Sequence, residues 1–215
     1  MNTVKNFYLS IVGLICFSLF GCSKDDTGTE NDVKSETSIS YIITISPDLL
    51  KFVTPQVKYI DENGNLITIT GIEDLDRKVI ENKAEIIDGK SSSSAWSSVV
   101  VTGTGYKCWT INMKFNRLNF HTCMEVKYLR KDFTEDTTGN IYNFHHNVNT
   151  SIDVIKTIGY STKAFSDTHM SVSRGNYKIG DDIEMYLDDL YKDSDKVGYY
   201  IDDNGDVTRK DDFNL

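Results

Sequence analysis

The sequence lacks the short motifs that mark the commoner hydrolases and metal sites. It contains no Cys-x-x-Cys, no His-Glu-x-x-His and no Gly-x-Ser-x-Gly. These absences argue against a zinc ribbon or thioredoxin-like site, a zinc-protease helix and the turn that presents a catalytic serine. His145 and His146 are consecutive in an expected strand and therefore point to opposite faces. We expect no metal, no cofactor and no catalytic residues, so the protein is not predicted to be an enzyme.

Positive charge is also scarce. The 215 residues include 23 Lys and Arg against 32 Asp and Glu, a formal net charge of −9. Such a chain repels phosphate backbones, so nucleic acid is not an expected partner. Residues 181–215 alone carry 12 acidic and 4 basic residues, a net charge of −8. A solvated acidic face is the simpler interpretation, and a cation-binding site is the more specific alternative.

One uncharged apolar run, residues 7–20, follows a lone Lys5. It is too short to cross a bilayer of about 30 Å as a permanent helix and has the layout of a secretory signal. The run leads into Leu19-Phe20-Gly21-Cys22, which resembles the lipobox of bacterial lipoproteins. That resemblance implies that residues 1–21 are removed as a signal peptide. It also implies that Cys22 becomes the lipidated, palmitate-bearing N-terminus.

The residues after the cysteine carry a second resemblance. Ser23, Lys24, Asp25 and Asp26 are similar to the acidic export tag of Bacteroidota surface lipoproteins. The resemblance implies an outer-membrane lipoprotein, anchored through its lipid and facing the cell exterior. The periplasmic face remains the alternative. Residues 22–38 are polar and predict a lipidated flexible tether, followed by one domain over residues 39–215.

Alternation of apolar and polar residues predicts antiparallel strands that cover a core. The expected strands are residues 40–46, 56–60, 66–70, 96–101, 109–115, 120–128 and 141–157, with a break near Asn149 and one more strand around 170–172. Asn63-Gly64 predicts a type I′ hairpin turn. Apolar residues at helical spacing over 183–191 predict one late helix, and residues 71–90 are ambiguous. The predicted fold is mainly β, an antiparallel immunoglobulin-like β-sandwich with one short helix in the C-terminal region.

Two cysteines, Cys108 and Cys123, remain in the mature chain, in a compartment where disulfides can persist. If their strands are hairpin neighbours, the register that best aligns the apolar stripes pairs Trp109 with Val126. The two thiols are then too far apart for a bond. We therefore predict free thiols, and a disulfide made in another register or between non-neighbouring strands is the alternative.

Few residues point to a ligand. Tyr160 and Tyr177 lie in expected glycine-containing loops, where an aromatic ring could face a ligand such as a sugar. Asp136-Thr137-Thr138 resembles the acceptor motif for O-glycosylation of exported Bacteroidota proteins, which implies a glycan on Thr137. His169 lies next to Ser166 and Asp167, but neighbouring positions do not build a triad.

The pattern of elements also resembles the uncharacterised β-sandwich lipoproteins of the Bacteroidota. This implies a non-catalytic binding or cell-surface accessory lipoprotein, with a glycan or another surface protein as candidate partner. The alternative is a fimbria-like structural subunit assembled by strand exchange. The third hypothesis is a hydrolase whose catalytic residues form no recognisable sequence motif.

Overall fold

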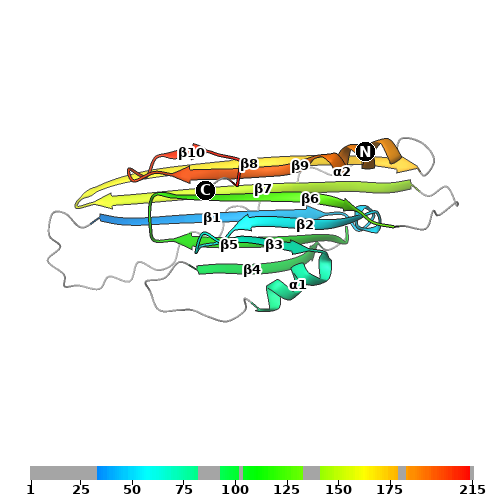
Figure 1. Ribbon diagram of the computed structural model, residues 1–215, viewed down its shortest axis with the longest axis horizontal. Helices are drawn as coiled ribbons and strands as arrows, with labels where there is room; N and C mark the ends of the chain where they lie inside the picture. The colour runs from blue at the N-terminus through cyan, green and yellow to red at the C-terminus, as the bar shows by residue number, and fades with distance from the viewer. Residues whose placement is uncertain (1–32, 82–92, 102–103, 133–140, 179–182, 214–215) are drawn as a thin grey trace, which may run out of the picture.

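The computed structural model describes residues 33–81, 93–101, 104–132, 141–178 and 183–213. Two antiparallel five-stranded sheets pack face to face, which confirms the predicted mainly-β sandwich. The strands run along the long axis of the molecule (Figure 1). Within the described part of the chain, no helix is long and apolar enough to span a membrane.

The first sheet has the strand order β4-β5-β1-β7-β8. Its strands are β1 (Val33–Ile45), β4 (Ser93–Val101), β5 (Tyr106–Phe115), β7 (Ile141–Ile158) and β8 (Ser161–Lys178). The second sheet has the order β10-β9-β6-β2-β3. Its strands are β2 (Val53–Ile60), β3 (Leu66–Thr70), β6 (Phe120–Arg130), β9 (Ser194–Ile201) and β10 (Val207–Arg209). An immunoglobulin-like arrangement is not confirmed, because that fold divides seven or nine strands unequally between its sheets.

Period-two alternation places one face of each inner strand in the core. In β1, the side chains of Ile39, Tyr41, Ile43 and Ile45 are at most 2% exposed, and those between them are only half-buried. The predicted stripe of β5 also faces inward, with Trp109 fully buried. The core is therefore the layer between the sheets, to which both helices add apolar residues.

Two α-helices flank the sandwich, where one was predicted. Helix α2 (Ile183–Lys192) buries Ile183, Leu187 and Leu190, as the periodicity indicated. Helix α1 (Ile72–Glu81) forms in the ambiguous segment and buries Leu75. It lies beside β3 and β4, whereas α2 lies near β8 and β9 on the opposite side (Figure 1). A short 3-10 helix, η1 (Leu49–Lys51), follows β1.

Several boundaries differ from the prediction. Strand β1 begins at Val33, inside the segment expected to be tether, because Val33 to Ser38 pair with β7 residues Asp153 to Ile158. Thr37 is fully buried there. Strand β7 is continuous through Asn149, and β8 extends over 18 residues.

The segments expected to form a hairpin, β5 and β6, belong to different sheets. Their apolar stripes meet across the core instead of side by side, and Phe115 stacks on Phe120 with ring centroids 4.2 Å apart. The predicted register is therefore wrong. Cys108 and Cys123 are both free, as predicted, but the reason is their placement in separate sheets.

The two Asn-Gly turns, at Asn63-Gly64 and Asn204-Gly205, share one local structure. In each, the first aspartate (Asp61 or Asp202) accepts hydrogen bonds from the backbone N–H groups two and four residues later. Only the glycine has a positive φ, +84° at Gly64 and +75° at Gly205. A type I′ turn needs two such residues, so that expectation is wrong.

The C-terminal residues cross the outer face of the second sheet. Lys210 N–H donates to the Gly198 carbonyl at 2.9 Å, and Gly198 N–H donates to Asp211 Oδ1 at 2.8 Å. The Lys210 carbonyl lies 2.9 Å from His121 Nε2. We call residues 210–213 the C-terminal strap, because its contacts with Gly198 and His121 hold it across β6 and β9. Cys123, on the outer face of β6, is fully buried.

Candidate functional site

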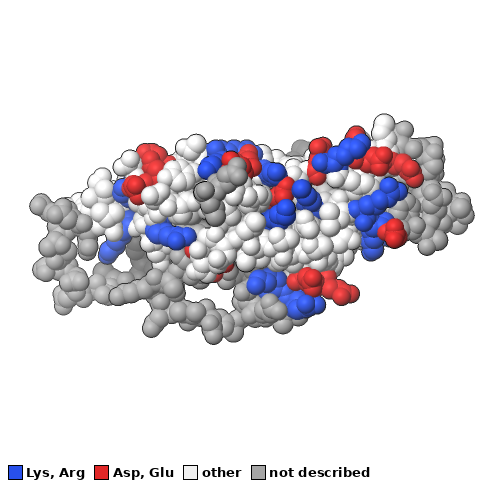
Figure 2. Space-filling view, viewed as in Figure 1, with Lys and Arg blue, Asp and Glu red and all other residues white. Residues whose placement is uncertain are grey.

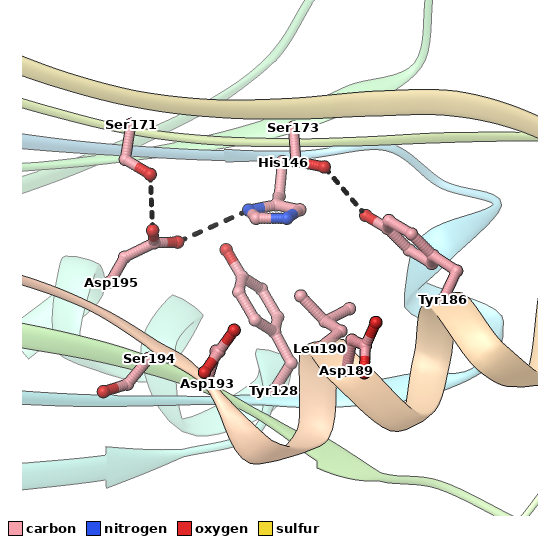
Figure 3. A pocket seen from close by; sticks show the side chains of 10 residues that line it. All are labelled: Tyr128, His146, Ser171, Ser173, Tyr186, Asp189, Leu190, Asp193, Ser194 and Asp195. Atoms are coloured by element: carbon pink, nitrogen blue, oxygen red, sulfur yellow. Dashed lines mark hydrogen bonds and ion pairs between the residues drawn. The ribbon is translucent and has the colours of Figure 1, made fainter.

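A cavity of about 340 Å³ opens between the two sheets beside α2. We call it the α2 pocket. Strands β6, β7 and β8, helix α2 and the start of β9 surround it (Figure 3). Its lining residues are Tyr128, His146, Ser171, Ser173, Tyr186, Asp189, Leu190, Asp193, Ser194 and Asp195.

The local sequence explains why polar groups gather there. On β8, alternate residues point toward the second sheet, and these include Ser171 and Ser173 where an inner strand would place apolar residues. On β7, the same periodicity turns His146 inward, with 5% of the residue exposed. Helix α2 ends at Lys192 and β9 begins at Ser194. The chain therefore turns sharply at the pocket and leaves Asp193 and Asp195 at its wall.

Asp195 is the centre of the hydrogen-bond network. Its Oδ1 accepts a hydrogen bond from Ser171 Oγ at 2.5 Å, and its Oδ2 lies 3.4 Å from His146 Nδ1. Burial alone would raise the pKa of Asp195, but the contacts with His146 and Ser171 outweigh it and hold the pKa below its ordinary value. Asp195 therefore stays ionised at neutral pH.

Tyr128 places a buried hydroxyl in the pocket, and this hydroxyl makes no hydrogen bond with the described residues. The residue is 2% exposed and its ring lies 4.7 Å from the His146 ring. Its hydroxyl has no hydrogen-bond partner among the described residues, and it points into the space between Asp195 and His146 (Figure 3). Burial raises the pKa of this phenol well above its ordinary value. Since an unpaired buried hydroxyl costs about 1–3 kcal/mol, such a group calls for a functional explanation.

The order of the groups does not suit nucleophilic catalysis. In a serine triad the imidazole lies between the serine and the carboxylate, so that it can take the serine proton. Here the carboxylate of Asp195 lies between Ser171 and His146. Ser171 therefore donates its proton to a weak base and is not activated. No group of three or more His, Cys, Asp or Glu residues in the described ranges is arranged to hold a metal ion.

The two aromatic residues singled out by sequence occupy opposite ends of β8. Tyr160 is fully exposed at the β7–β8 turn. The expected loop around Tyr177 is wrong, because the residue belongs to β8. Roughly 50 Å further along the strand, it packs its ring against Phe144 at 5.3 Å and Tyr186 at 4.7 Å. Tyr177 thus supports a pocket residue without lining the pocket. Cys22, the export-tag residues 23–26 and Thr137 lie outside the described residues.

No sequence motif singles out the residues that line the pocket. The alternation that turns His145 and His146 to opposite faces places only His146 in the pocket, where its Nδ1 makes an ion-pair contact with Asp195. Asp189, Asp193 and Asp195 all belong to the acidic C-terminal region, so the net charge of residues 181–215 was the signal available. Nothing local to the sequence shows that Tyr128 and Ser171 meet them.

A second charged cluster lies on the outer face of the second sheet. The Glu125 side chain is only 3% exposed and is approached by Lys196 at 3.1 Å, Lys58 at 3.6 Å and Lys127 at 3.7 Å. Ser194 Oγ also donates to Glu125. Positive and negative side chains are interspersed over the face shown in Figure 2, with no field of one sign. We interpret this cluster as structural, because its charges satisfy one another.

Comparison with protein-family models, with curated proteins and with solved structures finds no match for this chain.

Proposed function

We propose that this protein is a lipid-anchored outer-membrane lipoprotein that binds a small hydroxyl-bearing ligand, such as a glycan unit, in the α2 pocket and does not transform it. The anchor rests on the lipobox resemblance at Cys22. The ligand site rests on one structural observation. The buried Tyr128 hydroxyl lacks a partner among the described residues and points into a cavity lined by three carboxylates and three serines.

The size and chemistry of the pocket support this proposal. Ligand pockets typically occupy about 300–1,000 Å³, and the α2 pocket, at about 340 Å³, suits one sugar-sized molecule. A ligand hydroxyl both donates and accepts hydrogen bonds. It can therefore donate to the carboxylates of Asp189 or Asp193 and accept from Tyr128. The rings of Tyr128 and Tyr186 offer apolar faces for the ring of a sugar.

A matched pair of tyrosine variants tests the site. Tyr128→Phe removes an unpaired hydroxyl, so the free energy of unfolding should stay within about 0.5 kcal/mol, or rise. Ligand affinity should fall about threefold to tenfold, the value of one hydrogen bond. Tyr199→Phe is the control, because Tyr199 is equally buried but donates to Asp167 away from the pocket. It should cost stability and leave affinity unchanged.

The measurement is isothermal titration calorimetry with glucose, glucosamine and N-acetylglucosamine, together with thermal unfolding of each variant. Loss of affinity in Tyr128→Phe at unchanged stability supports the proposal. If none of the three sugars binds, or if Tyr128→Phe binds as the parent does, the α2 pocket is not their site.

Anchoring is tested separately. Cys22→Ala should abolish lipidation and leave the protein in the aqueous phase on detergent partitioning. Replacing Asp25 and Asp26 with Ala should leave lipidation intact but hide the protein from protease added to whole cells. Continued protease access in the second variant would contradict the export tag, and membrane partitioning of the first would contradict the lipobox.

The long edge of β8 favours a second candidate, a structural subunit that assembles by strand addition. Over its 18 residues β8 pairs with β7 alone, and no other described strand lies beside it. Met170→Lys would place a charge on its exposed face, and Met185→Lys, on the exposed side of α2, is a matched control. Sedimentation velocity of the Cys22→Ala protein should show self-association that only Met170→Lys removes. A monomer at every concentration would reject this candidate.

A further inference from the structure

The α2 pocket carries a strong local imbalance of charge. Asp189, Asp193 and Asp195 line it, and no lysine or arginine is among its described lining residues. Among the described residues, the only ion-pair contact of His146 is with Asp195. Even with a protonated His146, the lining would have a net charge of −2, obtained from three carboxylates and one imidazolium.

The two outer carboxylates are poorly compensated. Asp189 lies 4.0 Å from Lys192, but both side chains are more than 70% exposed, so water screens the pair. The Asp193 carboxylate has no ion pair or hydrogen bond with any residue that the structure describes. The Asp193 backbone N–H donates to the Asp189 backbone carbonyl at 3.1 Å, which fixes the position of the residue without neutralising its carboxylate.

Cationic side chains on the surrounding elements are engaged elsewhere. Lys58, Lys127 and Lys196 point to the opposite face of the second sheet and surround Glu125. On β8 and β10, His169 contacts Arg209, whose Nε pairs with Asp211. On the far side of α2, Arg130 lies over the Tyr191 ring at 5.9 Å. Among the residues that the structure describes, none provides a counter-ion for Asp193.

From this arrangement we infer that the ligand of the α2 pocket carries a positively charged amine as well as hydroxyl groups, as an amino sugar does. The inference rests on the proposed binding function and narrows its ligand class. The ammonium group lies against Asp193 and Asp195, and a hydroxyl of the ligand pairs with the Tyr128 hydroxyl. The nearby rings of Tyr128 and Tyr186 add a favourable interaction between a cation and an aromatic face.

The physical basis is the difference between a charge and a dipole. An ammonium group and a carboxylate in contact attract each other, and this attraction grows where protein replaces water around them. A neutral hydroxyl at the same place gains only a hydrogen bond, which largely replaces one that it made with water. Two buried neighbours, the phenol of Tyr128 and the imidazole of His146, exclude water from one side of the carboxylates and strengthen this preference.

The test compares three sugars that share one pyranose ring and differ in the group at carbon 2. Glucosamine is cationic at about pH 6, whereas glucose and N-acetylglucosamine are neutral. We expect glucosamine to bind at least about tenfold more tightly than either neutral sugar by isothermal titration calorimetry. Raising the salt concentration from about 50 to about 500 mM should weaken glucosamine binding and leave the neutral sugars nearly unaffected.

Charge-removing variants locate the effect. Asp193→Asn should lower glucosamine affinity about tenfold and leave the affinity for the neutral sugars unchanged. Asp188→Asn removes the same charge from an exposed position of α2 that does not line the pocket, and it should change neither. Because Asp193 is exposed, its substitution should not impair folding, which thermal unfolding verifies.

The outcomes separate the two proposals. A preference for glucosamine that Asp193→Asn abolishes supports the inference. If all three sugars bind equally and Tyr128→Phe weakens all of them, the ligand is a neutral polyol, so the inference is wrong and the binding function stands. If none binds, both proposals fail.

Discussion

Gly198 should be intolerant of any side chain, because the C-terminal strap lies directly on it. A Cβ atom at this position would lie 2.2 Å from the Lys210 carbonyl oxygen and 3.0 Å from both the Thr122 carbonyl oxygen and Cys123 Cβ. Gly198→Ala therefore requires the strap to move outward by roughly 1 Å, a distance that breaks well-formed hydrogen bonds.

The cost follows from what that movement breaks. The hydrogen bond from Lys210 N–H to the Gly198 carbonyl is worth about 0.5–1.5 kcal/mol, and the one from Gly198 N–H to the Asp211 carboxylate about 1.5–3 kcal/mol. We expect Gly198→Ala to lower the free energy of unfolding by about 2–4 kcal/mol. For a chain of this size that corresponds to a fall of roughly 5–15 °C in the thermal midpoint.

Removing the strap provides the control. In a chain that ends at Arg209 the Lys210 carbonyl is gone, so Gly198→Ala should cost less than about 1 kcal/mol. Thiol labelling gives an independent readout. Burial, followed by the charges of Asp211 and Asp212, raises the pKa of Cys123 to about 12, so this thiol should react slowly in the parent and faster in both altered chains. An equal cost of Gly198→Ala with and without the strap would refute the reasoning.

Three further outcomes are expected. Gly64→Val should cost about 1–3 kcal/mol in chemical denaturation, because φ is +84° there and no atom lies within 4 Å of the new Cβ; a neutral result would show that the turn relaxes freely. Burial would raise the pKa of Glu125, but bonds from Ser194 and Lys196 hold it below its ordinary value. Its charge therefore stabilises the fold above about pH 4 and loses this effect as the pH falls further. Glu125→Gln should thus cost about 1–3 kcal/mol at neutral pH and much less at about pH 3, and a cost independent of pH would contradict this. Deleting residues 33–38 should lower the thermal midpoint by many degrees, because Thr37 pairs with both Phe115 and Val154 inside the first sheet; an unchanged midpoint would show that this part of β1 is dispensable.

Local periodicity was enough to predict much of the fold. The stripe that includes Trp109 and Phe115 faces the core, and the stripe that includes Ile183 and Leu187 is the buried face of α2. Each of these depends only on the geometry of a single strand or helix. In a strand, residues two positions apart share a face, and in a helix, residues three or four positions apart do so. The choice of glycine at Gly64 is equally local, because the turn requires a positive φ at that residue.

The partners of each strand were decided by the tertiary structure. Adjacent β5 and β6 separate into opposite sheets, since that arrangement buries Phe115 against Phe120 and places both apolar stripes in one core. The same long-range packing brings His146 to Asp195 across 49 positions of sequence and leaves the Tyr128 hydroxyl unpaired between them. The sequence alone therefore determined most of the strands and the acidic C-terminal region. Only the packing of one sheet on the other turned three of those acidic residues into the wall of a pocket.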